Sequence, residues 1–160
     1  MSGPGPAASA VTRIDFAFGA PDRLPMACQV AGKRYRAGQR LVVYCSDATR
    51  LAAFDKLLWT FEDISFLPHV LANDPLAASS PIVLTAQAPA APVADTGGEL
   101  PWLMNLDDDC PPGYAQFARV LEIVSGEPAD RQTARQRWRT YQEAGHDLHA
   151  HDLSKPAGGA

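Results

Sequence analysis

The sequence predicts a single-domain, Rossmann-like α/β fold, a three-layer arrangement in which helices flank a mostly parallel sheet. Short runs rich in β-branched and aromatic residues alternate with helix-length amphipathic segments along the 160-residue chain, an order typical of parallel sheets. A domain of this length should bury roughly 70% of the surface of its unfolded chain. The composition, 46% hydrophobic and 20% charged, is ordinary for a globular protein. A chain of this length and composition can therefore fold around a single hydrophobic core.

The first half of the chain has the pattern of a βαβ unit followed by a second helix. Residues 13–19 (RIDFAFG) and 40–46 (RLVVYCS) are predicted strands, and the basic segment 21–37 between them has the length of a helix. Ser46 is a plausible N-cap for the next helix. That helix should pack on the sheet, because its apolar residues recur at helical spacing, at Leu51, Phe54, Leu58 and Phe61.

Three further strands are predicted in the second half of the chain. They cover residues 81–87, 100–106 and 118–126, each of which is a short apolar run. Residues 88–99 (APAAPVADTGGE) are rich in Pro, Ala and Gly, so we expect a mobile loop. A final helix opens after Gly126, and Pro in its first turn favours that start.

The two ends of the chain should lie outside the folded domain. We expect a flexible leader over residues 1–12, the α/β domain over 13–148 and a frayed tail over 149–160, which ends in KPAGGA. The leader lacks the basic segment and apolar stretch of a secretion signal. Nor does any apolar run approach the ~20 residues that span a bilayer. These features predict a cytoplasmic protein with no membrane partner.

The sequence predicts no metal site and no cofactor. The cysteines are widely spaced without a CxxC pair, which favours reduced core thiols: Cys28, Cys45 and Cys110. Three consecutive aspartates precede two prolines, a pattern more typical of a solvated turn than of a Mg²⁺ site: Asp107, Asp108 and Asp109. A His-rich tract of the kind that can bind a transition metal adventitiously lies in or near the expected tail, which weakens it as evidence for a site: His146, His149 and His151.

Nucleotide-binding enzymes with this type of fold carry a glycine-rich turn, which is missing here. The first strand is followed by GAPDRL in place of GxGxxG, and GxxxxGK[ST] does not occur. Without those glycines the backbone cannot approach a pyrophosphate closely. No Ser or Cys sits in a recognisable nucleophile elbow either. An enzyme therefore stands as an alternative hypothesis without support from a motif.

The final helix gathers cations in a chain whose formal net charge is -4. At about 100° per residue, Arg131, Arg135 and Arg139 form one row. Beside that row runs the stripe expected to face the sheet, which consists of Ala134, Trp138, Tyr141 and Gly145. Arginines next to an aromatic ring suit a ligand with carboxylates and an apolar part. A solvated helix face and a single-stranded nucleic-acid site are the alternatives that the spacing leaves open.

Four stretches of the sequence together resemble one family, the chi subunit of bacterial DNA polymerase III holoenzyme. They are YRAGQRLVVYCSD, AFDKLLWTFEDISFLPH, NLDDDCPPGYAQFARVLEIVSG and ARQRWRTYQEAGHDL, and the similarity runs from Arg13 to Leu148. The most specific pieces are LW followed by SFxPH, the NLDD turn before PP, and the final R-x-R-W-x-x-Y-x-x-AG helix. The Ala/Pro loop, the leader and the tail depart from the shorter family pattern.

The resemblance implies a non-catalytic adaptor of the replicase clamp-loader complex. Chi subunits grip the acidic, Phe-terminated C-terminal tail of single-stranded DNA-binding protein, so DNA is contacted indirectly. Carried onto this sequence, the resemblance places tail binding at Arg131, Arg135, Trp138 and Arg139. It places contact with the clamp-loader subunit psi at Phe66, and we expect Trp59 to contribute there.

Direct DNA binding remains a separate hypothesis. The negative net charge disfavours it, while the basic run KRYR, which contains Lys33, Arg34 and Arg36, keeps it open. Cations at that place are also favoured by the dipole of the helix that they end.

Overall fold

The computed structural model describes residues 11–60, 68–72, 74–75, 80–89 and 100–153. Its centre is a seven-stranded sheet in the order β3-β4-β2-β5-β6-β1-β7, in which every pairing is parallel. The strands are β1 (Arg13–Ala20), β2 (Leu41–Tyr44), β3 (His69–Leu71), β4 (Ile82–Thr85), β5 (Trp102–Asn105), β6 (Arg119–Ser125) and β7 (Asp147–Asp152). The helices are α2 (Arg23–Arg36), α3 (Ala48–Thr60), the 3-10 turn η2 (Tyr114–Gln116) and α4 (Pro128–Glu143).

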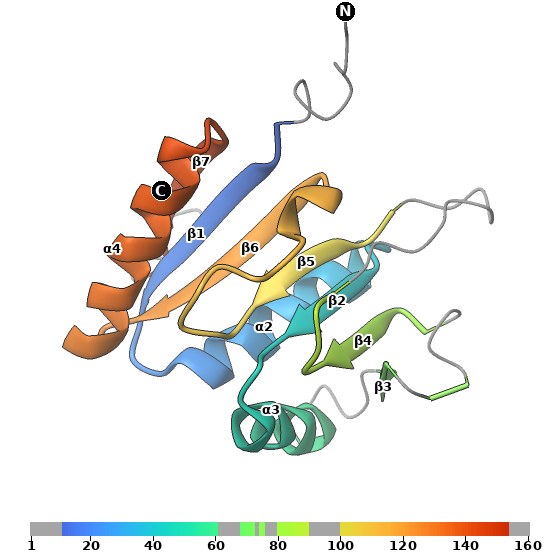
Figure 1. Ribbon diagram of the computed structural model, residues 1–160. Coiled ribbons are helices and arrows are strands. Elements are labelled where there is room, and N and C mark those ends of the chain that lie inside the picture. The colour runs from blue at the N-terminus through green and yellow to red at the C-terminus, as the bar shows by residue number, and fades with distance from the viewer. Residues whose placement is uncertain (1–10, 61–67, 73, 76–79, 90–99, 154–160) are drawn as a thin grey trace, which may run out of the picture.

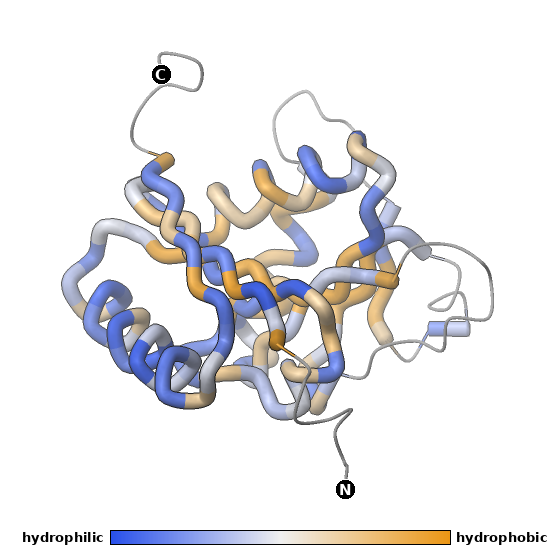
Figure 2. The backbone as a smooth tube through the Cα atoms, turned by 90° about the horizontal axis from the view of Figure 1, so that it is seen from above, coloured by the Kyte–Doolittle hydropathy of each residue, from blue (hydrophilic) through white to orange (hydrophobic). Residues whose placement is uncertain are grey.

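Helices cover both faces of the sheet, so the predicted three-layer α/β fold is confirmed (Figure 1). On one face, α2 and α3 pack on β2, β4, β5 and β6 around a core that contains Phe54 and Met104. On the other face, α4 and η2 pack on β1, β2, β5 and β6 around Phe117 and Tyr141. Figure 2 shows the contrast between the layers, because α4 is drawn mostly in hydrophilic colours beside a more hydrophobic sheet. Among the described helices, none is long and apolar enough to cross a membrane.

Two of the seven strands were not predicted from the sequence, and both lie at the edges of the sheet. The prediction of a frayed tail is wrong for residues 149–152, which pair with β1 from His149↔Asp15 to Asp152↔Phe18. The polar sequence DLHAHD lacks the apolar run that marked the central strands. Its pairing comes from the open edge of β1, a tertiary partner that local periodicity cannot reveal.

The ends of two helices also differ from the predictions. Asp47, not Ser46, caps α3, since its Oδ1 accepts hydrogen bonds from the backbone N–H groups of Thr49 at 2.9 Å and Arg50 at 3.2 Å. Gly145 does not face the sheet. It follows the end of α4, with φ of 88° and an exposed position, as is common for a glycine just beyond a helix C-terminus.

Candidate functional site

The face of α4 that the arginine row occupies points away from the core. Arg131, Arg135 and Arg139 are exposed, as expected for residues four apart on one side of a helix. Trp138 lies at the border of this face and is half-buried. Its ring packs on Phe16 of β1 with 5.0 Å between ring centroids. The tryptophan therefore connects the charged side of α4 to the apolar surface of the sheet.

The structure brings all four of these residues to one groove, of about 600 Å³, between α4 and the carboxyl ends of the neighbouring strands. Arg131, Arg135, Trp138 and Arg139 form the helical wall. The opposite wall and floor consist of residues from β1, the end of β6 and β7, namely Phe16, Phe18, Gly19, Val124, Ser125, Gly126 and Ala150. The groove thus combines a basic rim with an apolar floor.

The floor contains residues that the sequence interpretation did not assign to a site. Phe16 and Phe18 are two apart on β1, so both side chains point to the α4 side of the sheet. The alternation in RIDFAFG was the available signal, although it did not tell which face α4 would cover. Gly19 has φ of 104°, and the β1–β6 register shifts between Phe18 and Ala20. A residue without a Cβ adopts that backbone easily, which favours glycine in this bulge.

The guanidinium groups of the row are available to a ligand. Among the described residues, no ion pair joins Arg131, Arg135 or Arg139 to a carboxylate. Arginine binds carboxylates through paired N–H donors, and such bonds are stronger near an apolar surface than in open water. The groove can therefore hold a carboxylate-rich chain that also carries an apolar side chain.

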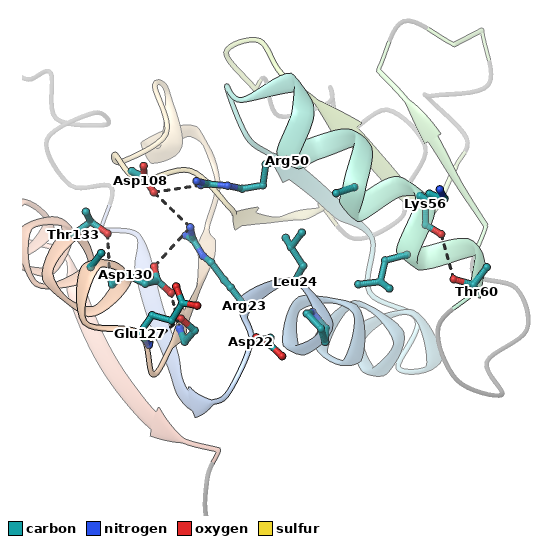
Figure 3. A pocket seen from close by; sticks show the side chains of 15 residues that line it. Asp22, Arg23, Leu24, Arg50, Lys56, Thr60, Asp108, Glu127, Asp130 and Thr133 are labelled. Carbon is teal, nitrogen blue, oxygen red and sulfur yellow. Dashed lines mark hydrogen bonds and ion pairs between the residues drawn. The ribbon is translucent and has the colours of Figure 1, made fainter.

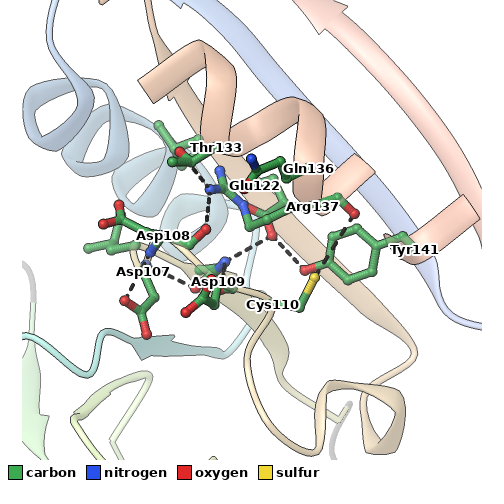
Figure 4. A network of polar contacts seen from close by, with 12 residues as sticks. Asp107, Asp108, Asp109, Cys110, Glu122, Thr133, Gln136, Arg137 and Tyr141 are labelled. Carbon is green, nitrogen blue, oxygen red and sulfur yellow. Dashed lines mark hydrogen bonds and ion pairs between the residues drawn. The ribbon is translucent and has the colours of Figure 1, made fainter. Parts of the chain in front are cut away.

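A fourth arginine of the same helix has a different position. Arg137 is buried at 2% exposure, and its Nε donates to Oε1 of Glu122 on β6 at 2.9 Å (Figure 4). Burial alone would lower the pKa of Arg137, but the Glu122 carboxylate holds that pKa above its usual value. The sequence interpretation missed this residue. The signal was Glu122 itself, a single carboxylate inside the apolar strand RVLEIVS.

A larger hollow, of about 800 Å³, lies at the carboxyl edge of the sheet, between α2, α3 and the start of α4 (Figure 3). It adjoins the carboxyl ends of the strands, where parallel α/β folds commonly bind nucleotides. Arg23 extends into this space, where Nε donates to the Ile123 carbonyl at 2.7 Å and Nη2 donates to the Asp107 carbonyl at 2.8 Å. Arg50 pairs with Asp108 at 3.3 Å. The two arginines here thus bind carboxylates and backbone carbonyls, and the described wall of the hollow has no glycine-rich turn.

Two of the three aspartates after β5, Asp107 and Asp108, contact the arginines of this polar region. Asp108 is largely exposed and pairs with Arg50, in keeping with the predicted solvated turn. The oxygen atoms of Asp107 accept hydrogen bonds from the backbone N–H groups of Ser46 and Asp108. The described residues contain no group of His, Cys, Asp or Glu side chains that could hold a metal ion.

The cysteines and the basic run fit structural explanations. Cys28 and Cys45 are buried in the core and Cys110 is half-buried, and all three are free thiols. Burial raises the pKa of Cys28 to about 12 and that of Cys110 to about 11, so these thiols are poorly ionised and unreactive at neutral pH. Lys33, Arg34 and Arg36 all lie in the last turn of α2, as predicted from KRYR.

The second predicted surface lies near the end of α3. Trp59 is 47% exposed, and its ring packs on His69 with 4.7 Å between ring centroids. The His69 Nε2 lies 2.8 Å from Oδ1 of Asp55 on α3. Phe66 lies outside the described residues. Because α3 and α4 cover opposite faces of the sheet, Trp59 and the arginine groove are separate surfaces.

Comparison with known proteins gives one consistent result. The sequence model of the DNA polymerase III chi subunit family, HolC, matches residues 11–149. The chain belongs to the DNA polymerase III chi subunit family. It is similar to the DNA polymerase III subunit chi of Pseudomonas aeruginosa, with 35% identity over 150 residues that cover 91% of this chain and 99% of that relative. It is also similar to the corresponding subunit of Escherichia coli, with 28% identity over 123 residues, 77% of this chain and 80% of that protein.

The family match covers almost the whole described domain. It includes the arginine row, Trp138, Trp59 and the buried Arg137–Glu122 pair, and it ends at His149, within β7. The last residues of β7, among them Ala150, which lines the groove, follow the matched residues directly.

Proposed function

We propose that this chi-family chain is a non-catalytic adaptor of the bacterial clamp-loader complex. In this proposal the groove on α4 binds the acidic C-terminal tail of single-stranded DNA-binding protein, and DNA is contacted indirectly through that protein. The observation that carries the proposal is one groove that joins an aromatic floor to three arginines, none of which has an ion pair within the described part of the chain. We place the protein in the cytoplasm, with no cofactor.

The chemistry of such a tail matches the two parts of the groove. Its carboxylates would lie along Arg131, Arg135 and Arg139, where paired N–H donors are available. Its terminal Phe would enter the apolar part between Trp138 and the floor of the groove. Burying an aromatic side chain contributes free energy that salt does not screen, whereas the arginine contacts weaken as salt increases.

A psi-like clamp-loader subunit is the second proposed partner. Trp59 supports this proposal, because a large aromatic residue that is half exposed at a helix end is typical of a contact residue at a protein interface. Phe66 is the other proposed contact residue. Since Trp59 and the groove lie on opposite faces of the sheet, both partners could bind at the same time.

The alternatives are a nucleotide-binding enzyme and a direct single-stranded nucleic-acid-binding module. Arg23 and its hydrogen-bond partners argue against the nucleotide-binding enzyme, because they lie where a nucleotide phosphate would be expected. Arg34 argues against the nucleic-acid-binding module, because its guanidinium packs 5.3 Å from the centroid of the Trp102 ring and so has a structural role.

One set of titrations distinguishes the three functions. Isothermal titration of the full chain with an acidic peptide that ends in Phe should give one saturable site. Matched titrations with ATP and with a single-stranded oligonucleotide should give no saturable heat. Saturable ATP binding would favour the enzyme, and oligonucleotide affinity that falls steeply with salt would favour the nucleic-acid module.

A further inference from the structure

A buried polar network lies beneath α4, at the position where an apolar stripe was expected. Arg137 and Glu122 are 2% and 0% exposed, and their charges meet at 2.9 Å. The other carboxylate oxygen of Glu122 accepts hydrogen bonds from the Tyr141 hydroxyl at 2.5 Å and from Nδ2 of Asn105 at 2.9 Å. Nη1 of Arg137 donates to the carbonyl of Asp108 at 2.9 Å (Figure 4). The network therefore ties α4 to β5, β6 and the turn between them.

The apolar contacts of α4 come mainly from two aromatic rings. Tyr141 is buried and the half-buried Trp138 packs on Phe16 of β1, whereas Ala134 has little apolar surface to bury. Apolar burial is also non-directional, so a short stripe of this kind leaves the rotation of a helix about its own axis weakly specified. A guanidinium–carboxylate pair is directional and is satisfied in only one orientation.

The rotation of α4 decides where the arginine row points. Successive helical residues differ by about 100°, so Arg137 lies roughly 160° around the helix from Arg135, with Trp138 between them. When Arg137 faces Glu122, the row faces the open side and Trp138 forms the border of the groove. A turn of α4 by one residue that brings Arg137 to the position of Trp138 would move Trp138 outward and carry the row away from the groove, whereas the opposite turn would bring Arg135 to the buried position of Ala134.

We propose that Arg137 and Glu122 are positioning residues for the groove, and that their buried pair, with Tyr141 and Asn105, fixes the rotation of α4. This inference rests on the proposed tail-binding function, because positioning has a consequence only if the groove binds a ligand. Buried ion pairs are often no more stabilising than apolar residues of the same size. The network should accordingly matter more to the orientation of α4 than to the stability of the domain.

The test replaces the network without leaving an unpaired charge. In the triple variant Arg137→Met, Glu122→Met and Tyr141→Phe, the free energy of unfolding in urea should stay close to that of wild type. Backbone amide exchange within α4 should accelerate, and affinity for an acidic peptide that ends in Phe should fall about fivefold or more, because the peptide must then order the helix. The single variant Arg119→Met is the control, since it removes an ion pair with Asp15 on the other face of the sheet and should change neither α4 readout.

The outcomes separate this inference from the function on which it rests. Unchanged peptide affinity in the folded triple variant, whatever the exchange rate, overturns the positioning role. If the triple variant fails to fold, Tyr141→Phe alone decides, because it removes one hydrogen bond to Glu122 and keeps the charges. Faster α4 exchange with weaker peptide binding then supports the inference, and no change in either overturns it. If the wild-type chain does not bind the peptide, the proposed function is wrong. If amide exchange within α4 is also the same in the triple variant as in wild type, the positioning role is wrong as well.

Discussion

Arg135 is the residue whose loss should most weaken tail binding. It occupies the centre of the arginine row, one helical turn from both Arg131 and Arg139, and it lines the groove. A hydrogen bond to a charged group contributes about 1.5–3 kcal/mol, and Arg135 is exposed, so the lower end of that range applies. About 1.4 kcal/mol corresponds to a tenfold change in affinity. Arg135→Ala should therefore raise the dissociation constant for the tail peptide roughly tenfold.

The assay for this prediction is isothermal titration of wild-type and variant chains with the same acidic, Phe-terminated peptide. Arg135→Lys should recover only part of the loss, because an ammonium keeps the charge but lacks the paired donors of a guanidinium. Arg36→Ala is the matched control, since it removes an exposed positive charge on α2, which packs on the opposite face of the sheet. Equal affinity of Arg135→Ala and wild type would refute the reasoning and make the row a solvated helix face.

Three other predictions concern the partner surface, acid stability and the start of α3. Trp59→Ala and Phe66→Ala should each weaken association with a psi-like subunit in a pull-down. Tail-peptide affinity should stay within about twofold, since distant sites act independently. Loss of both interactions in a folded variant would contradict the two-surface proposal. Burial alone would raise the pKa of Asp15, but contacts with His151, Arg13 and Arg119 hold it below its usual value of 3.8, so its stabilising contribution is present above pH 4 and is lost as pH falls through the lowered pKa. Urea unfolding between pH 7 and pH 2 should then show a shallower acid decline for Asp15→Asn than for wild type, and parallel curves would refute this. Asp47→Ala should lower the free energy of unfolding by about 1 kcal/mol because it removes the α3 cap, and an equal effect of Ser46→Ala would contradict that assignment.

The central strands and the three helices could be predicted because their apolar periodicity is local. Residues 13–19 and 118–126 are apolar enough to read as strands without knowledge of their neighbours. The edge strands β3 and β7 could not be predicted this way. DLHAHD is polar, and its strand geometry depends on pairing with β1, which lies far away in sequence.

The candidate site, too, could be predicted from the sequence only in part. The row of Arg131, Arg135 and Arg139 follows from helical spacing alone, and the structure places these residues beside Trp138 as the pattern indicated. Phe16 and Phe18 could not be assigned to the floor, because the face of the sheet that α4 covers is a tertiary property. The burial of Arg137 could not be predicted, because an arginine in a basic helix is usually solvated. Only its buried partner on β6, Glu122, explains why it is buried.

Mapping of the bound peptide on the backbone amide spectrum of the ¹⁵N-labelled chain tests the central claim most directly. Addition of an acidic peptide that ends in Phe should shift the amides of α4 around Arg135, those of β1 near Phe18 and the Trp138 indole N–H. The same peptide without its final Phe should no longer shift the Phe18 region. Shifts that cluster instead around Arg23 and Arg50, in the hollow between α2 and α3, would contradict the account.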